Sequence, residues 1–249
     1  MATRIKAERI VPVSEEIIAI RDRWHCMKHP FYDRLSEGKL ELKHLGVFLT
    51  QHYVLVGHIF KSLGITYAKA PTDVCRFIVE NLAEEAGLLG IDGGEAHDHS
   101  DLIFRFTRHC SFTDEQVKAT EQLPTWYARA AAYWWLAQSD PAIVRIALQA
   151  TQESQLVGEN GGRVVPALIK HYGFTKDSPE IHFFVEHSTA DVKHGNQMLT
   201  LVDRHVTTPE LRARVVSVVE QLAKLRYASF TELYRVTHLG QPVIEPPAR

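Results

Sequence analysis

The chain has 249 residues, of which 45% are hydrophobic and 23% are charged. This composition is typical of a globular protein with a sizeable core, and it excludes disordered, collagen-like and low-complexity classes. The 28 Lys and Arg residues nearly balance the 30 Asp and Glu residues. Because neither sign is in excess, we expect neither a nucleic acid nor an anionic membrane surface as a partner.

The three cysteines, Cys26, Cys75 and Cys110, lie far apart and form no Cys-x-x-Cys motif. This pattern favours small buried thiols in a reducing compartment over a disulfide framework or a thiolate metal site. Residues 1–16 lack the apolar segment of a secretory signal. No apolar run approaches the roughly 20 residues of a membrane span. We therefore expect a cytoplasmic protein.

Helical periodicity dominates the pattern of apolar residues, most clearly between Leu42 and Leu63, where they recur at steps of three and four. Capping side chains precede proline at Asp140, Ser178 and Thr208, and 113–116 reads as a capping box. In chain order, the predicted helices span residues 14–28, 40–68, 73–87, 99–109, 114–138, 141–158, 162–172, 179–205 and 209–237. Alternating strand patterns bounded by turn residues are absent from the sequence. The sequence predicts one all-α domain over 1–249, with a short N-terminal lead and a Pro-rich tail at 241–249.

The strongest chemical signal is the spacing His187-x-x-x-Asp191-x-x-His194 on the helix predicted for 179–205. At about 100° per residue, these three side chains fall within about 60° of one another on one helix face. Imidazole and carboxylate groups are ligands of iron, manganese and zinc, and helical bundles build dinuclear sites from several facing helices. A solvated helix face is the alternative interpretation of this trio.

A bundle site also needs carboxylates from other helices. Glu153 lies among small and neutral residues, and Glu84 and Glu85 end a helix with apolar residues before them. A buried acid must be paired, protonated or bound to metal. His97 and His99 open the next helix, and one of them is a further candidate ligand. The aromatic cluster of residues 126–135 is interpreted as core, with a substrate-stacking wall as the alternative.

Together these motifs resemble the haem-oxygenase-like diiron oxidase superfamily, above all its branch of Chlamydia protein associating with death domains, and also PqqC and TenA proteins. The resemblance rests on residues 28–40 (KHPFYDRLSEGKL), 81–87 (NLAEEAG), 99–106 (HSDLIFRF), 153–155 (ESQ) and the spacing at 187–194. It covers roughly Trp24 to Met198. It implies a seven-helix haem-oxygenase-like bundle.

The resemblance also implies the ligands of a two-metal centre and prefers Glu85 to Glu84 and His99 to His97 by motif alignment. The implied set is Glu85, His99, Glu153, His187, Asp191 and His194. The implied cofactors are two iron ions, or an iron–manganese pair, with O₂ as co-substrate.

In the branch that makes 4-aminobenzoate, a tyrosine in the motif of Tyr32 is consumed, and a lysine follows the middle glutamate by ten positions. This chain has Arg163 at that position. Arginine is a poor amine donor because its guanidinium stays protonated. The candidate catalytic residues are Tyr32, Tyr53 and Arg163, and we expect Tyr53 and His52 to line the pocket.

The resemblance therefore implies an O₂-dependent dimetal oxidase that acts on a small molecule or on its own Tyr32. A metal-independent, PqqC-like oxidase is the first alternative, with histidines as general bases. A non-enzymatic helical interaction module is the second. A homodimer is expected by analogy with the fold.

Overall fold

The computed structural model describes residues 11–90, 93–156 and 162–244, and the side chains of residues 189–192 lie outside the described part. In chain order, the α-helices are α1 (Val13–Arg23), α2 (Pro30–Ser36), α3 (Leu42–Tyr67), α4 (Thr72–Glu85), α5 (His99–His109), α6 (Asp114–Lys118), α7 (Pro124–Ser139), α8 (Ala142–Glu153), α10 (Val164–Tyr172), α11 (His182–His205) and α12 (Pro209–Thr237). Short 3₁₀ turns cover Cys26–Lys28, Ser154–Leu156 and Pro179–Ile181. The described residues form no strand, which agrees with the all-α prediction.

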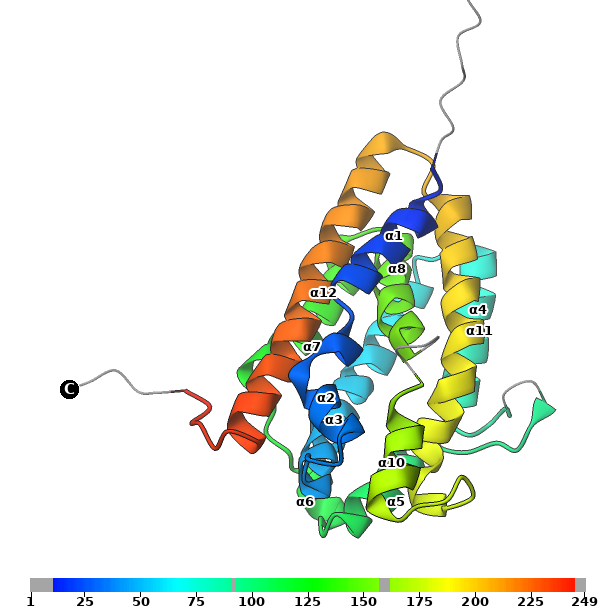
Figure 1. Cartoon of the computed structure of the whole chain (residues 1–249). Helices are drawn as coiled ribbons and strands as arrows, with labels where there is room; N and C mark the ends of the chain where they lie inside the picture. Colours follow the sequence, from blue (N-terminus) through cyan, green and yellow to red (C-terminus); the bar gives the residue numbers. More distant parts are fainter. Residues whose placement is uncertain (1–10, 91–92, 157–161, 245–249) are drawn as a thin grey trace, which may run out of the picture.

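The helix α8 lies inside the bundle, between the long helices α11 and α12 (Figure 1). Every residue from Ala142 to Gln152 is buried. A helix that is buried on all sides must be covered on all sides, and α1, α3 and α7 also pack against it. Because Glu153 is the last residue of α8, the fold places this acid at the end of the most buried helix.

Three predicted helices have clearly different bounds. The predicted helix 141–158 ends as an α-helix at Glu153 and continues as a 3₁₀ turn to Leu156, and residues 157–158 lie outside the described part. The predicted helix 14–28 ends at Arg23, and a separate helix, α2, begins at Pro30, where the ring of His29 accepts a hydrogen bond from the backbone N–H of Phe31. The predicted helix 114–138 is split, because α7 begins at Pro124, a residue that cannot continue a helix from before it. The helices α5 and α12 have the predicted bounds.

The predicted caps had mixed outcomes. The Thr208 side chain accepts from the N–H of Leu211, and the capping box at 113–116 is present. The carboxylate of Asp140 does not cap α8 and instead pairs with Arg214 at 2.6 Å. Ser178 precedes a 3₁₀ turn, without a capping hydrogen bond from its side chain.

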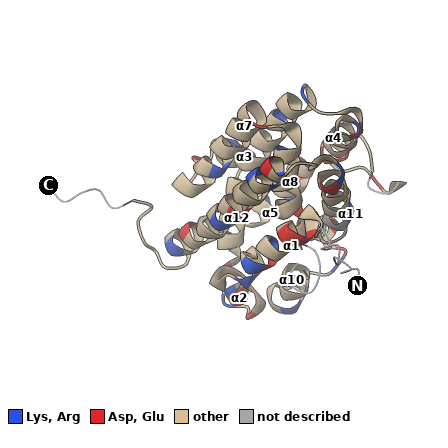
Figure 2. Cartoon of the chain, turned by 90° about the horizontal axis from the view of Figure 1, so that it is seen from above, with Lys and Arg blue, Asp and Glu red and all other residues tan. Residues whose placement is uncertain are grey.

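The three cysteines are free thiols, with Cys26 and Cys110 buried and Cys75 partly buried, as their isolated positions predicted. Acidic and basic positions are interspersed over the helices (Figure 2). None of the described helices combines the length and the apolar character needed to cross a lipid bilayer.

Candidate metal centre

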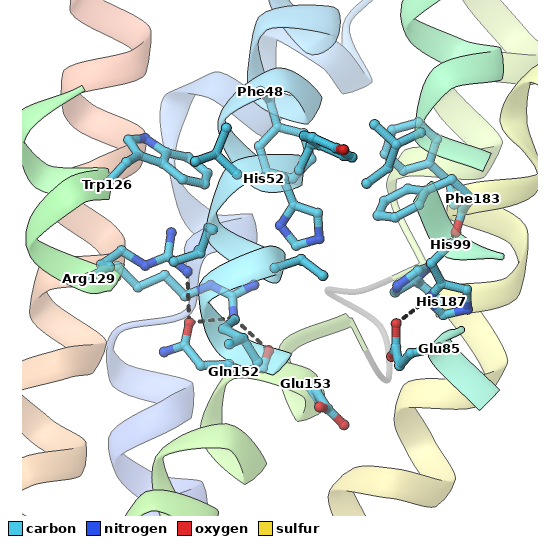
Figure 3. Close-up of a pocket in the computed structure, with 18 of the residues that line it drawn as sticks. Phe48, His52, Glu85, His99, Trp126, Arg129, Gln152, Glu153, Phe183 and His187 are labelled. Carbon is cyan, nitrogen blue, oxygen red and sulfur yellow. Dashed lines mark hydrogen bonds and ion pairs between the residues drawn. The ribbon is translucent and has the colours of Figure 1, made fainter. Parts of the chain in front are cut away.

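A cavity of about 570 Å³ lies among α3, α5, α7, α8, α11 and α12. Aromatic side chains, including Phe48, Trp126 and Phe183, form much of its wall. Polar side chains lie on opposite sides of it (Figure 3). Glu85, His99 and His187 lie on one side, and Arg129 and Gln152 lie on the other. Glu153, which follows Gln152 in α8, lies between the two groups.

The loop between α4 and α5 brings Glu85 and His99 together. Residues Ala86 and Asp98 form an isolated antiparallel bridge, so the chain leaves and returns at one point. Gly87 makes this possible, because its φ is +67° and a Cβ there would lie 2.6 Å from the backbone N of Asp98. As a result, the carboxylate of Glu85 contacts Nδ1 of His99 as an ion pair.

His187 joins this pair from α11. Its ring centroid lies 4.8 Å from that of His99. Its Nδ1 is 2.6 Å from the backbone carbonyl oxygen of Phe183. When Nδ1–H donates to that oxygen, Nε2 is left with a lone pair, which is the arrangement that second-sphere hydrogen bonds give to metal-binding histidines.

Burial and neighbouring charges set the protonation of this cluster. Burial lowers the pKa of His99, but the ion pair with Glu85 outweighs it, so that the pKa is raised overall. Burial likewise opposes ionisation of Glu85, yet His99 holds the pKa of this carboxyl below its usual value. Burial and the charge of His99 lower the pKa of His187 to about 4. His187 is therefore neutral near pH 7, as a metal ligand must be.

A second group of donors surrounds His194, which is 3% exposed. Its Nε2 contacts the carboxylate of Glu84, and its Nδ1 lies 3.8 Å from Oε2 of Glu153 and 3.3 Å from the amide nitrogen of Asn81. Gln149 donates to Oε1 of Glu153 at 2.5 Å. Burial, with a further contribution from Glu85, raises the pKa of Glu153 to about 7.

The described residues fit a metal centre in their chemistry. Oxygen and nitrogen donors of Glu and His suit iron and manganese. Oε2 of Glu153 is buried and accepts no hydrogen bond from the described residues, so it has lone pairs to offer. The side chain of Asp191, the remaining predicted ligand, lies outside the described residues.

Among the described side chains, no three His, Cys, Asp or Glu residues converge closely enough to hold an ion. Two of the histidines instead form pairs with glutamates, His99 with Glu85 and His194 with Glu84. A bound cation would replace these contacts. Of the 84–85 pair, Glu85 lines the cavity, whereas Glu84 does not and contacts His194 instead. His97 does not line the cavity, and its Nδ1 lies 2.5 Å from a carboxylate oxygen of Glu186.

Tyr32, His52 and Tyr53 all line the cavity, as the sequence predicted for the last two. Tyr32 is 3% exposed, and burial raises the pKa of its phenol well above 10. The ring of Tyr53 lies 5.1 Å from that of Phe104. His52 stacks on Phe48 with ring centroids 5.6 Å apart.

Arg163 does not have the position that a catalytic role requires. It is absent from the cavity wall, and its guanidinium donates to the backbone carbonyl of Met27, to Ser36 and to Asp33. The two residues that flank it in sequence, Gly162 and Val164, do line the cavity. The side chain therefore points outward and holds α2 in place.

Sequence reasoning missed the polar side chains opposite the acids, namely Arg129, Gln152 and Arg226. Arg129 lies in a helix with apolar neighbours, so the argument applied to Glu153, that a buried charge needs a reason, was available for it as well. Arg226 gave no such signal, because α12 is amphipathic with many charges.

Solved structures with this arrangement of helices define the fold class. A domain from Shewanella denitrificans OS217, described as having a haem-oxygenase-like fold, superimposes with a TM-score of 0.77 and 19% identity, covering 95% of this chain and 97% of the other. A TenA homologue from Pseudomonas syringae gives a TM-score of 0.72 at 16% identity, covering 90% and 91%. The fold is thus the haem-oxygenase-like helical bundle.

Sequence comparison defines the family. The chain belongs to the family described as iron-containing redox enzymes, which it matches over residues 47–227. This membership makes the chain an oxidoreductase and confirms the resemblance to the haem-oxygenase-like superfamily. Among its relatives, a 4-aminobenzoate synthase of Chlamydia muridarum is 24% identical over 76% of this chain and 77% of its own length. A 4-aminobenzoate synthase of Nitrosomonas europaea is also 24% identical, over 83% and 85%.

Proposed function

We propose that this protein is an O₂-dependent oxidase with a non-haem dimetal centre of two iron ions or an iron–manganese pair. The observation that supports the proposal is the pair of buried His–Glu groups contributed by α4, α5, α8 and α11. Four of their members line one cavity, namely Glu85, His99, Glu153 and His187. Glu85, His99 and His187 would bind metal on one side of this centre, and Glu153, His194 and Asp191 would bind metal on its other side. Bound iron would supply the electrons for the reduction of O₂.

The chain's own side chains prepare this chemistry. Phe183 orients His187 through the hydrogen bond to Nδ1, and Gln149 orients Glu153. The aromatic wall limits water around the substrate, which strengthens electrostatic interactions within the cavity. Neutral His52 adds no positive charge beside the metal ligands, since burial lowers its pKa well below 6.5.

Metal content and O₂ consumption after anaerobic loading with Fe(II) test this proposal. We expect two ions per chain in the wild type, and loss of both metal and O₂ consumption in His99→Ala and in the double variant His187→Ala/His194→Ala. His109→Ala is the matched control, because this exposed histidine ends the same helix that His99 begins. Trace metal in the loaded wild type, or full activity after chelation, would refute the proposal, and activity after chelation would favour the metal-independent alternative.

A second candidate function concerns Tyr32 as the substrate. It is favoured by the position of this tyrosine in the cavity wall and by relatives named 4-aminobenzoate synthase. Arg163 cannot supply the amine from its outward position. The lysines that line the cavity, Lys61 and Lys118, are exposed.

Mass spectrometry after aerobic turnover with iron distinguishes the two candidates. Consumption of Tyr32 predicts a mass loss at this residue and a release of an aromatic product that stops after one equivalent. Tyr32→Phe should then abolish the product and retain metal binding. An unchanged mass at Tyr32 after many equivalents of O₂ would show that the substrate is a separate small molecule.

A further inference from the structure

Two arginines converge on one side of the cavity. Arg129 comes from α7 and Arg226 from α12, and both line the cavity. Each has a guanidinium nitrogen 3.0 Å from the same oxygen, Oε1 of Gln152. Arg129 is only 5% exposed. Arg226 is half-buried, and the two like charges share one neutral acceptor.

No described carboxylate neutralises this pair. Nη1 of Arg129 and Nε of Arg226 are buried and have no hydrogen-bond partner among the described residues. The remaining contacts of Arg129 and Arg226 are neutral, with the ring of Trp126 4.8 Å from Arg129 and the backbone carbonyl of Gln152 2.6 Å from Arg226. Leaving buried donors of a cation unsatisfied is costly, and an anion in the cavity would relieve that cost.

A third buried arginine provides the comparison. Arg145 of α8 is 0% exposed, but its guanidinium donates to Ser62, to Gln149 and to the backbone carbonyl of Ile59. All its nitrogens have partners among the described residues, and it does not line the cavity. Arg145 is thus satisfied by the fold, whereas Arg129 and Arg226 keep donors available for a ligand.

We propose that Arg129 and Arg226 form a binding site for the carboxylate of a small aromatic acid, held in the cavity by its charged end. A guanidinium fork matches the geometry of a carboxylate. Phe48 and Trp126 provide an aromatic surface next to it. Three candidate metal ligands, Glu85, His99 and His187, lie across the cavity, beyond His52 (Figure 3). An acid anchored by the arginines would present its ring toward the metal centre.

The assignment of this acid as substrate or product rests on the proposed function. The relatives' product, by their name, is 4-aminobenzoate, which is an aromatic monocarboxylate of the proposed class. The anion site itself needs no metal. Binding to metal-free protein can therefore be tested separately from oxidation.

The experiment is calorimetric titration of the chelator-treated full chain with benzoate, and with benzamide as the uncharged analogue. We expect saturable binding of benzoate and binding of benzamide at least about tenfold weaker. Arg129→Met and Arg226→Met should each weaken benzoate binding by on the order of 10- to 100-fold and leave benzamide unchanged. Arg108→Met, at an exposed arginine paired with Asp114, is the control and should change neither.

Arg129→Lys covers the case in which the methionine variant does not fold, because it keeps the charge and loses the fork; it should retain weakened benzoate binding. Absence of saturable benzoate binding, equal binding of benzamide, or full binding by both arginine variants would overturn the proposal. Inorganic phosphate that competes as strongly as benzoate would overturn its assignment to carboxylic acids. Loss of O₂ consumption with intact benzoate binding would refute only the proposed function.

Discussion

The burial of Glu153 predicts a specific cost to the stability of the folded protein. Burial raises its pKa from 4.5 to about 7. Ionising this carboxyl in the folded, metal-free protein therefore costs roughly 3 kcal/mol more than ionising it in the unfolded chain. Because the folded pKa is the higher one, the penalty is absent below pH 4.5, grows as the pH rises to about 7 and stays constant above that.

Glu153→Gln removes the charge and keeps an oxygen that can accept the hydrogen bond from Gln149. In the presence of a chelator, we expect the variant to be more stable than the wild type by up to about 3 kcal/mol above neutral pH, or roughly 10 °C in Tm. Near pH 4.5 the two should be equally stable. Thermal denaturation across this pH range measures the difference, with Glu210→Gln at the surface as the control.

Addition of Fe(II) should reverse the order, since the wild type gains the stability of bound metal and the variant loses a ligand. A difference in stability between Glu153→Gln and the wild type that does not change with pH would refute the conclusion that burial raises the pKa of Glu153. So would a metal-free Glu153→Gln that is less stable than the wild type above neutral pH.

Gly87→Ala should cost about 2–3 kcal/mol and weaken metal binding, because it combines a left-handed φ of +67° with a clash against the backbone of Asp98. Gly173→Ala, at a φ of +79° with nothing within 4 Å, should cost only about 1 kcal/mol and leave metal affinity unchanged. Chemical denaturation and metal titration measure both variants, and equal losses in Gly87→Ala and Gly173→Ala would refute this reasoning. The hydrogen bond from His205 holds the pKa of Asp73 at about 2. Asp73→Asn should therefore lose under about 1 kcal/mol of folding stability above pH 3.8. This loss should shrink as the pH falls through 2 and as salt is added. Denaturation profiles of Asp73→Asn and the wild type that differ equally at every pH would contradict this.

The fold was predictable where local patterns were strong. The helices α5 and α12 have the predicted bounds, because capping residues mark where both begin and a long apolar stripe defines α12. The errors in helix bounds came where a proline, rather than the apolar period, determines where a helix begins. α2 is a single short helix set by His29 and Pro30, and periodicity gives no signal over so few residues.

The site was partly predictable for a different reason. The spacing of His187 and His194 is a property of one helix, so the sequence fixes which residues share a face. The arginines opposite them come from α7 and α12, and only the tertiary structure brings Arg129 and Arg226 to one oxygen of Gln152. The resemblance supplied the candidate ligands and also Arg163 as a catalytic candidate, but Arg163 does not line the cavity and its guanidinium donates to the backbone carbonyl of Met27.

The cavity is lined by an acid and by a cation that each have a buried atom without a hydrogen-bond partner among the described residues. Glu153 is an acid with a buried oxygen that lacks a donor among the described residues, and Arg129 is a cation with a buried nitrogen that lacks an acceptor. Between them His52 is neutral, because burial and the nearby His187 lower its pKa. His52 therefore carries no charge that could pair with the acid. The proposed metal cations beside Glu153 and the proposed carboxylate beside Arg129 would each give one of these buried atoms a partner.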